Sequence, residues 1–475
     1  MLIDTKQWTE KIKKINKPNP KYYILTMGCQ LNENDSEKIA GMLVEAGYEK
    51  TLKENEADII VFNTCCVREN AEDRLFGKLG EVKKYKEEKG TIIAIGGCMM
   101  QEKHIVQKLK ESYPYVDVIF GTHTLEKFAE DLFIAISENK KIEDIIDIDG
   151  NVYEGTPIER EDKFRASVTI MNGCNNFCTY CIVPYVRGRE RSRAPQSIID
   201  EVECLAKAGY KEIMLLGQNV NSYLVSKKNQ EPYNEEVVVN GEKAKVNSFA
   251  TLLRAINKID GIERIRFVSP HPKDFTDDVI LAIKECNKVC KLIHLPLQSG
   301  STEVLKKMNR VYTKEQYLKL VEKIRKEIPE VAFTTDIIVG FPGETEEDFE
   351  DTLDVVGKVR FDQIYMFIYS RRVGTPADKM EDQIPEEVKH TRFDKLKNLA
   401  EEIFAEKNKA YVGTTQKILV EGKSKNNDNM LTGRTDSYKV VNFEGTDDLI
   451  GKIINVKIVS EHMWYLKGKY DTINA

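Results

Sequence analysis

The sequence predicts a three-part α/β protein: a doubly wound amino-terminal α/β domain, a central (βα)6 partial barrel and a small carboxyl-terminal β-barrel. The first two parts are indicated by two separate series in which short apolar runs alternate with amphipathic helical patterns. A third pattern indicates the last part, since β-rich runs separated by Gly and Asp turns follow a long charged helix. With 475 residues, the chain is long enough for about three domains.

The first series, residues 21–139, follows a polar extension at residues 1–20. The runs expected to form strands are Tyr22–Thr26, Ile59–Asn63, Thr91–Ile95 and Val116–Phe120. Helical patterns begin at Asp35, after Asn70 and at Lys103. This alternation is typical of a doubly wound parallel sheet, in which ligands bind at the carboxyl ends of the strands.

An acidic, irregular linker is expected at residues 140–162, and the second series occupies residues 163–395. Its strand-like runs are Ala166–Met171, Glu212–Leu216, Arg264–Val268, Leu292–Leu297, Ala332–Val339 and Gln363–Tyr369. Helical patterns between them include Ser197–Ala208, Phe249–Ile259, Asp277–Cys286, Lys314–Ile328 and Glu346–Val359. Six βα units predict a partial barrel, which a polar surface insertion over Ser222–Asn247 interrupts.

The last part, residues 396–475, is expected to contain a connecting helix and a β-barrel. The helix begins after Pro385 and runs to about Lys409. The β-rich runs are Lys417–Val420, Lys439–Phe443 and Lys452–Ile458. Small β-barrels commonly bind RNA through basic grooves and aromatic stacking. The residues of those kinds here are Lys417, Lys423, Lys425, Arg434, Tyr438, Lys439, Phe443 and Trp464.

Composition excludes several classes of protein. Hydrophobic residues make up 41% of the chain, yet no apolar run approaches the ~18 residues of a membrane-spanning helix. The start is polar and Lys-rich, unlike a secretory signal, so we expect a cytoplasmic protein without a membrane partner. We also expect it to act as a monomer. The net charge of −6 argues against a surface coated with nucleic-acid-binding charge, so any RNA site must be local.

Three of the ten cysteines share one loop directly after the first strand of the second series. Cys174, Cys178 and Cys181 stand in the run Gly-Cys-Asn-Asn-Phe-Cys-Thr-Tyr-Cys. A 4Fe-4S cluster normally has four cysteine ligands, so three would leave one iron open for a small molecule. A zinc site is the alternative, but structural zinc favours four ligands arranged in pairs.

A second trio, Cys29, Cys65 and Cys98, is spread along the amino-terminal domain. Each cysteine lies just past a predicted strand, so all three are expected at one edge of the sheet. Soft thiolates gathered there suit a second iron–sulfur cluster, although free cysteines are also common in protein cores. The other cysteines are expected in the core, with Cys66 either there or beside the cluster; these are Cys66, Cys204, Cys286 and Cys290.

The three-then-two spacing of the first trio resembles the signature of radical S-adenosylmethionine enzymes. Together with the second trio and the terminal barrel, the chain resembles the MiaB-type tRNA methylthiotransferases over nearly its whole length. The matching runs are Met-Gly-Cys-Gln-Leu-Asn at 27–32, Asn-Thr-Cys-Cys-Val-Arg at 63–68 and the segment 173–193. After the first cysteine, the sister enzyme for a ribosomal protein typically has Pro-Lys and the sister for threonylcarbamoyladenosine has Lys, whereas this chain has Gln30.

The resemblance implies a radical S-adenosylmethionine partial barrel and a TRAM-like terminal barrel. It also implies transfer of a methylthio group to carbon 2 of N6-isopentenyladenosine, at position 37 beside the tRNA anticodon. Two 4Fe-4S clusters and two molecules of S-adenosylmethionine per turnover would serve this reaction. One molecule would be reduced at the cluster of Cys174, Cys178 and Cys181, and the other would methylate a sulfur on an auxiliary cluster. The partners implied are the anticodon stem-loop, an external electron donor and a sulfur source.

Polar residues at the carboxyl ends of barrel strands face the active site. We expect S-adenosylmethionine to contact Gln218, Asn219, Gln298, Thr335 and Asp336, with turn and cap roles as the alternative. Phe177 and Tyr180 could pack on its adenine or shield the cluster, and ordinary aromatic packing is the alternative.

Four arginines alternate directly after the first cysteine loop: Arg187, Arg189, Arg191 and Arg193. In an extended segment they would project on one side, where guanidinium groups suit RNA phosphates. A solvated loop is the alternative.

Three other functions are compatible with the same residues. The chain could transfer the methylthio group to N6-threonylcarbamoyladenosine in tRNA, or to a ribosomal protein. In a different class, a non-catalytic iron–sulfur or zinc RNA-binding protein would use the same cysteines but would not cleave S-adenosylmethionine.

Overall fold

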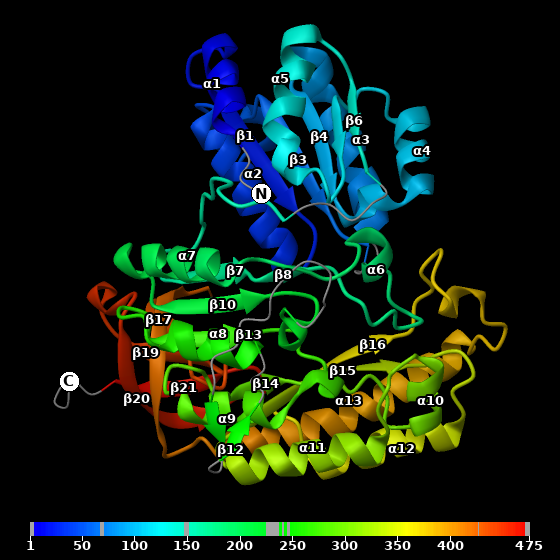
Figure 1. Ribbon diagram of the computed structural model, residues 1–475, viewed down its shortest axis with the longest axis vertical. Helices are drawn as coiled ribbons and strands as arrows, with labels where there is room; N and C mark the ends of the chain where they lie inside the picture. The colour runs from blue at the N-terminus through cyan, green and yellow to red at the C-terminus, as the bar shows by residue number, and fades with distance from the viewer. Residues whose placement is uncertain are drawn as a thin grey trace.

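The computed structural model describes residues 4–66, 71–146, 152–224, 237–239, 242–244, 248–425 and 427–470. It confirms the predicted fold class, with a doubly wound α/β domain, a partial barrel of six parallel strands and a closed five-stranded barrel. In Figure 1 the amino-terminal domain forms a separate upper lobe, and the other two parts form the lower one.

The amino-terminal domain is built on a parallel sheet with the strand order β2-β1-β3-β4-β5-β6. The strands are β1 Lys21–Thr26, β2 Glu49–Lys50, β3 Ile59–Thr64, β4 Ile92–Gly97, β5 Val118–Phe120 and β6 Ile142–Asp144. One face packs on α2 Gln30–Glu45 and α5 Phe128–Glu138, and the other on α3 Ala71–Lys89 and α4 Lys103–Ser112. Strand β3 is buried throughout, which explains its continuous apolar run.

Four helices and strands of this domain lie where no element was predicted: α1, β2, α5 and β6. Helix α1, Lys6–Ile15, occupies the polar extension and packs on α5, with the Trp8 and Phe133 rings 5.5 Å apart. Strand β6 lies in the predicted linker and pairs with β5 at the sheet edge. Helix α2 also begins earlier than the expected Asp35. Strands β2 and β6 are only 2 and 3 residues long, too short to show an alternating pattern. Helix α1, by contrast, carries Trp8, Ile12 and Ile15 at helical spacing within a Lys-rich segment that was interpreted as a polar extension.

The pKa of Asp131 on α5 gives this domain a testable pH dependence. Burial, followed by the charges of Asp144 and Glu130, raises this pKa from 3.8 to about 7. The folded state therefore binds more protons than the unfolded state between about pH 4 and 7, and the free energy of unfolding falls as the pH rises through that window. We expect Asp131→Asn to be more stable than the wild type at pH 8, by up to about 4 kcal/mol, and equally stable near pH 4. Urea unfolding at both pH values measures this, and a difference independent of pH would contradict it.

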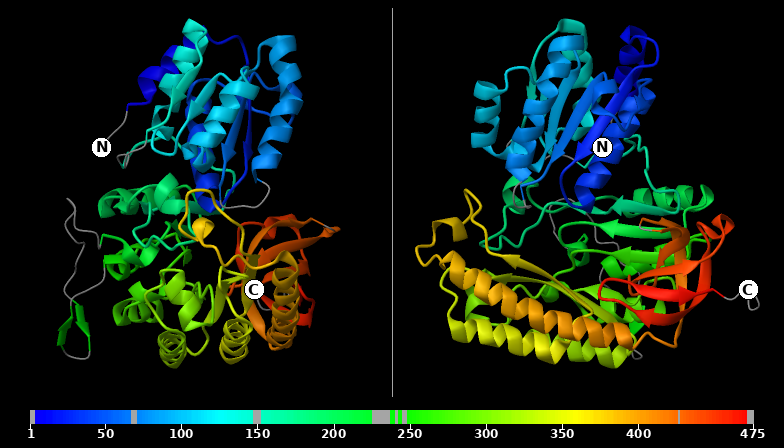
Figure 2. Two further views of the ribbon diagram at one scale, coloured as in Figure 1. Left: turned by 90° about the vertical axis from the view of Figure 1, so that its right-hand side faces the viewer. Right: turned by 180° about the vertical axis from the view of Figure 1, so that it is seen from behind.

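The central part is the predicted partial barrel of six parallel strands. They are β7 Arg165–Thr169, β10 Glu212–Leu216, β13 Arg264–Phe267, β14 Leu292–His294, β15 Ala332–Val339 and β16 Gln363–Ile368. A bridge between Ile265 and Val289 joins its two halves. In the part of the chain described, β7 and β16 are edge strands, so the barrel is open between them (Figure 2).

Helices cover the outside of this barrel and enclose its apolar core. They are α7 Pro195–Lys207, α8 Ser248–Asn257, α9 Asp277–Glu285, α11 Lys314–Glu327 and α12 Glu346–Val359. Three shorter pieces were not predicted: α6 Val183–Val186, α10 Thr302–Lys307 and the hairpin of β8 Met171–Asn172 with β9 Arg191–Ser192. The predicted surface insertion begins too early, because Ser222, Tyr223 and Leu224 are buried in the barrel domain. Further along it, β11 Val237–Val239 and β12 Glu242–Ala244 form a hairpin, and residues 225–236, 240–241 and 245–247 lie outside the described residues.

The carboxyl-terminal part begins within the long helix α13, Glu386–Lys409, which packs on the core through Leu396, Ile403 and Phe404. The predicted boundary at residues 395 and 396 falls inside this helix. The strands that follow are β17 Thr415–Ser424, β18 Asn427–Arg434, β19 Val440–Glu444, β20 Ile453–Glu461 and β21 Leu466–Lys469. They close in the order β17-β18-β19-β21-β20.

The closed barrel covers the amino ends of the partial-barrel strands. Arg264 and Arg266 on β13 reach it with hydrogen bonds of 2.7 to 2.8 Å to the carbonyl oxygens of Lys417, Arg434, Thr435 and Asp436. Several residues considered for RNA contact are therefore engaged elsewhere. Lys439 donates to the Asp362 carbonyl at 3.0 Å and Phe443 is fully buried, whereas Trp464 is 67% exposed.

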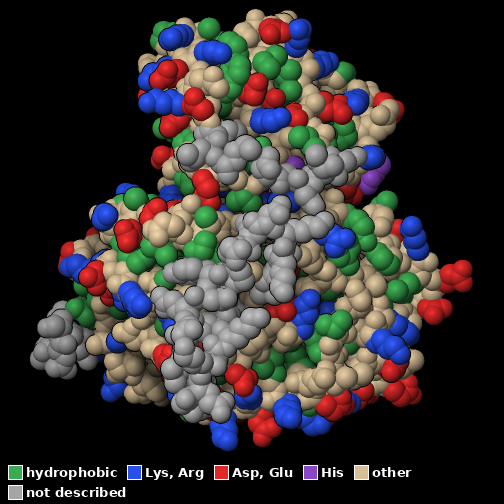
Figure 3. Space-filling view, viewed as in Figure 1, with side chains coloured by type: hydrophobic (Ala, Val, Ile, Leu, Met, Phe, Trp, Pro, Cys, Tyr) green, Lys and Arg blue, Asp and Glu red, His purple; other side chains and the backbone are tan. Residues whose placement is uncertain are grey.

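Charge is evenly mixed on the face that Figure 3 shows, where Lys and Arg alternate with Asp and Glu. This fits the net charge of −6 and the expectation that any RNA contact is local. None of the described helices has the length and apolar content that a membrane span requires.

Candidate functional site

The loop with the first cysteine trio leaves the carboxyl end of the first barrel strand. Cys174 and Cys178 are buried and Cys181 is half-buried. The loop is anchored where the Cys174 amide donates to the Gly188 carbonyl at 3.1 Å. Gly173 is required there, because its φ is +79° and a Cβ would lie 2.1 Å from the Arg189 carbonyl oxygen.

The thiols of this loop lie close enough for their charges to interact. The pKa of Cys181 is raised to about 12, first by burial and then by the charges of Cys178 and Cys174. The pKa of Cys174 is raised to about 11 by burial, with a further contribution from Cys178. Across the described residues, no three His, Cys, Asp or Glu side chains lie close enough for a single metal ion. Three thiols on one loop whose charges interact are suited to a 4Fe-4S cluster, in which each thiolate binds a different iron.

Arg310 lies beside this loop and was not anticipated from the sequence. Its buried guanidinium donates to the Cys178 sulfur at 3.7 Å, to the Tyr312 hydroxyl at 2.9 Å and to the Pro296 carbonyl at 2.9 Å. A buried cation in contact with Cys178 and near Cys181 offsets the charge of those thiolates. No sequence motif identifies Arg310, because its contact with Cys178 forms only when the fold brings the segment after α10 next to the cysteine loop.

The second trio gathers at the carboxyl ends of three neighbouring strands. Cys29 is the residue before α2 and follows β1, Cys65 directly follows β3, and Cys98 directly follows β4. Cys65 and Cys98 are buried and Cys29 is exposed. Asn32 fixes the arrangement, since its amide donates to the Thr64 carbonyl at 3.0 Å while its oxygen lies 3.4 Å from the Cys29 sulfur.

The surroundings of the second trio favour thiolates. Burial alone would lower the pKa of Arg187, but the charges of Asp35, Cys98 and Cys29 raise it. One guanidinium therefore lies near two of the three sulfurs. The pKa of Cys98 is lowered, because Cys66 donates a hydrogen bond to it and Arg187 lies beside it.

The remaining cysteines divide as follows. Cys66 packs in a buried cluster with Cys98, Ile182 and Val186, so it lies in the core beside the trio as expected. Cys286 and Cys290 are buried, which confirms their core placement. The prediction for Cys204 is wrong, because this residue is exposed on the outer face of α7.

The expectation that four arginines project from one side of an extended segment is also wrong. Helix α6 and the positive φ of Gly188 turn the chain, so the side chains diverge. Arg187 is buried against Asp35, and Arg193 forms ion pairs of 2.7 Å with Glu154 and Glu201. Arg191 is half-buried near His123. Arg189 is exposed and lies over the Phe177 ring at 4.3 Å.

Two of the residues expected to contact S-adenosylmethionine lie beside the first cysteine loop. Asn219 donates to Asp274 at 2.9 Å and to Glu190 at 3.4 Å, and Glu190 accepts from the Asn175 amide. The side-chain carbonyl oxygens of Gln218, Asn219 and Asn176 are buried without a hydrogen-bond partner in the described structure. Buried polar atoms are normally satisfied, so these oxygens are suited to accept from a bound molecule.

Other members of that set have structural partners. The Thr335 hydroxyl is fully buried, donates to the Leu295 carbonyl at 2.8 Å and accepts from the Leu297 amide at 2.8 Å. Gln298 joins the sheet edge through backbone bonds to β15, and Asp336 lies 3.3 Å from His294.

The two aromatic residues of this loop also have ring and packing contacts. Tyr180 packs on Val304 and Phe341, and Phe177 contacts the Tyr185 ring edge-on at 5.9 Å. Ordinary packing, the alternative considered for both, accounts for these contacts.

Family models match all three parts of the chain. The radical SAM superfamily model covers residues 168–356, uncharacterized protein family UPF0004 covers 21–121, and the TRAM domain covers 409–470. A tRNA-2-methylthio-N(6)-dimethylallyladenosine synthase of Clostridium botulinum (strain Alaska E43 / Type E3) is 54% identical over 97% of this chain and 98% of its own length. A protein of the same name from Acetivibrio thermocellus is 54% identical over 94% and 90%, respectively. The chain belongs to this family.

Membership of the tRNA-2-methylthio-N(6)-dimethylallyladenosine synthase family confirms the MiaB-type resemblance. A solved structure of the radical S-adenosylmethionine methyltransferase TsrM from Kitasatospora setae matches with a TM-score of 0.53 and 14% identity, over 75% of each chain. That match supports the fold alone. The radical SAM domain implies a 4Fe-4S cluster and S-adenosylmethionine. The thiols of Cys174, Cys178 and Cys181 and the buried oxygens beside them fit both groups.

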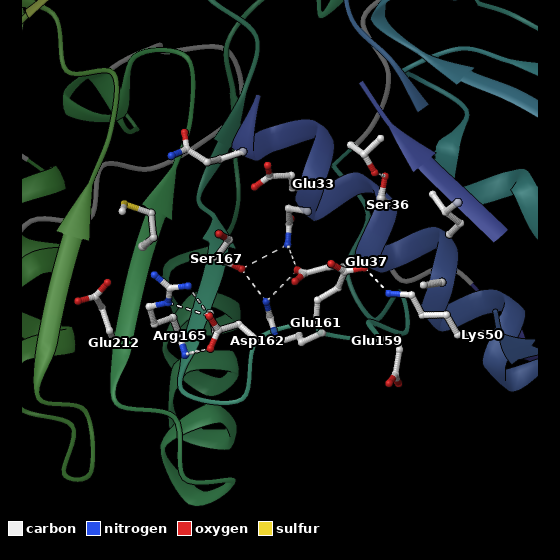
Figure 4. A pocket seen from close by; sticks show the side chains of 18 of the residues that line it. Glu33, Ser36, Glu37, Lys50, Glu159, Glu161, Asp162, Arg165, Ser167 and Glu212 are labelled. Carbon is white, nitrogen blue, oxygen red and sulfur yellow. Dashed lines mark hydrogen bonds and ion pairs between the residues drawn. The ribbon is translucent and has the colours of Figure 1, made fainter. Parts of the chain in front are cut away.

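A cavity of about 1070 Å³ lies between α2, the strands β7 and β10, and the closed barrel. Figure 4 shows Glu33 and Glu37 of α2 across from Ser167 of β7. The charged side chains lining it are Glu33, Glu37, Lys50, Glu159, Arg160, Glu161, Asp162, Arg165, Glu212 and Lys425. Carboxylates outnumber cations here, so this cavity disfavours RNA phosphates.

Proposed function

We propose that this chain adds a methylthio group to carbon 2 of N6-isopentenyladenosine at position 37 of tRNA, giving 2-methylthio-N6-isopentenyladenosine. The names of relatives 54% identical over nearly the whole chain support this reaction. The TRAM domain supports an RNA substrate. The substrate is the anticodon stem-loop, and an external electron donor and a sulfur source are required.

The observation that carries this proposal is one turn that contacts both cysteine trios. The Gly188 carbonyl accepts from the amide of Cys174, and the neighbouring Arg187 side chain donates to the Cys98 sulfur at 3.2 Å. Because one turn holds both cysteine trios, the groups that the trios bind can act on the same atom of one bound substrate.

In this proposal Cys174, Cys178 and Cys181 bind the radical SAM cluster, and Cys29, Cys65 and Cys98 bind a second 4Fe-4S cluster. Two molecules of S-adenosylmethionine are used per turnover. When bound, these groups supply a radical that removes hydrogen from carbon 2 and a methylated sulfur that replaces it. Such chemistry is needed because an aromatic C–H bond offers no polar leaving group, and the protein contributes binding and orientation.

The chain's own residues hold the small molecule and limit access to water. The unpaired oxygens of Gln218 and Asn219 accept from its amino or hydroxyl groups. Asp336 lies on β15, and Gln298, beyond the end of β14, is bonded to that same strand. Arg310 balances the charge of Cys178, and the Tyr180 ring packs behind the loop.

RNA contact is assigned to exposed groups near the site. Arg189 is exposed, and its guanidinium can reach a phosphate while it stacks on Phe177. Arg191 is half-buried, so only the exposed edge of its side chain can contact RNA. Because the substrate is tRNA, we place the activity in the cytoplasm, with the monomer as the working unit.

The test is mass spectrometry of nucleosides from stem-loops that carry either N6-isopentenyladenosine or N6-threonylcarbamoyladenosine. Each is incubated without oxygen with the reconstituted chain, reductant and S-adenosylmethionine. The proposal predicts the methylthio product from the first RNA only. Product from the second RNA alone would favour the sister enzyme. No 5′-deoxyadenosine from protein with intact clusters would favour a non-catalytic RNA-binding protein.

A further inference from the structure

Arg187 belongs to the barrel domain, but its side chain ends inside the amino-terminal domain. Only 5% of the residue is exposed. Its Nη2 atom lies 2.7 Å from the Asp35 carboxylate on α2, and its Nε atom donates to the Cys98 sulfur at 3.2 Å. One planar group thus contacts a carboxylate and a thiol of the second trio at the same time.

The segment that carries Arg187 is fixed on both sides. Just before it, Ile182 and Val186 of the α6 region pack on Cys98 and Cys66. The Thr122 hydroxyl also donates to the Val186 carbonyl at 2.5 Å. Just after it, the Gly188 carbonyl accepts from the Cys174 amide. A shift of this segment would therefore move the two trios relative to each other.

The hydrogen bond from Arg187 to the Cys98 sulfur should also affect the reduction potential of a cluster bound there. A hydrogen bond from a cation to a cysteine sulfur stabilises the more negative, reduced form of an iron–sulfur cluster and so raises its reduction potential. Arginine suits this position because its fork donates in two fixed directions, whereas lysine offers a single point charge. Asp35 holds the fork in the orientation that aims Nε at the sulfur.

Building on the second cluster of the proposed function, we propose that Arg187 is a positioning residue that fixes the cluster of Cys29, Cys65 and Cys98 against the barrel and raises its reduction potential. Asp35 acts through Arg187 by orienting it.

The test uses the full chain with Cys174, Cys178 and Cys181 changed to alanine, so that only the second cluster can form. After anoxic reconstitution, the midpoint potential is measured by a redox titration followed by electron paramagnetic resonance. The variants compared in this parent are Arg187→Gln, Arg187→Lys, Asp35→Asn and the control Arg193→Gln. The control comes from the same segment and also loses buried ion pairs, to Glu154 and Glu201, but it contacts neither trio in the described structure.

We expect Arg187→Gln to change the ratio of reduced to oxidised cluster at least tenfold, which lowers the midpoint by about 59 mV for one electron. Arg187→Lys and Asp35→Asn should lower it less, and Arg193→Gln should leave it unchanged. If Arg187→Gln fails to fold, the lowered midpoint of Asp35→Asn still supports the inference.

Equal midpoints in the parent and in both the Arg187 and Asp35 variants would overturn this role for Arg187 while leaving the second cluster intact. A parent that binds no iron would instead overturn the second cluster, and the inference with it.

Discussion

We expect Cys178→Ala to abolish the formation of 5′-deoxyadenosine from S-adenosylmethionine. The substitution removes one of the three thiolates of the cysteine loop, together with the sulfur that accepts from Arg310, so the loop can no longer hold its cluster. Chromatography with mass spectrometry after anoxic incubation with reductant measures the product. We expect a loss to the background of protein-free samples.

Cys204→Ala is the matched control, because Cys204 is exposed and lies outside both trios. It should form 5′-deoxyadenosine at the wild-type rate. Iron analysis separates loss of the cluster from loss of the fold, since Cys178→Ala should retain about half of the iron. Sustained cleavage by Cys178→Ala would show that this loop does not hold the reactive cluster.

Cys65→Ala separates the two chemical tasks. Cys65 is buried at the end of β3, far in sequence from the loop that binds the radical SAM cluster. We expect this variant to retain some cleavage of S-adenosylmethionine but to transfer no methylthio group to RNA. Both products are measured in the same reaction by mass spectrometry.

Cys286→Ala is the control for this variant, because it also removes a buried thiol but lies outside both trios. Its loss should leave methylthio transfer in place. If Cys65→Ala and Cys178→Ala lost the same activities, separate roles for the two trios would be refuted.

The sequence predicted the strands that are buried on both faces of the sheet. Strand β3 and its neighbour β4 are buried on both faces, so their apolar runs are unmistakable. The trio of Cys29, Cys65 and Cys98 was predictable for a related reason: the carboxyl ends of neighbouring parallel strands meet at one sheet edge. Strands β2 and β6 were missed because they are only 2 and 3 residues long. Helix α1 was missed although Trp8, Ile12 and Ile15 have helical spacing, because lysines dominate the segment around them.

The details of the site depend on contacts that no local pattern encodes. The alternation of Arg187, Arg189, Arg191 and Arg193 has the period of a strand, but Gly188 adopts φ +75° and redirects the chain. Two of these arginines consequently bind carboxylates in the interior. Arg310 was overlooked for the same reason, since its contact with Cys178 joins segments 132 residues apart.

The most direct test of the proposed chemistry follows the hydrogen on carbon 2. An anticodon stem-loop whose N6-isopentenyladenosine carries deuterium at that carbon is incubated with the fully reconstituted chain, reductant and S-adenosylmethionine. We predict that 5′-deoxyadenosine gains one deuterium as the methylthio product appears. Formation of that product with the deuterium released to water, and none in 5′-deoxyadenosine, would contradict the shared use of both trios at one carbon atom.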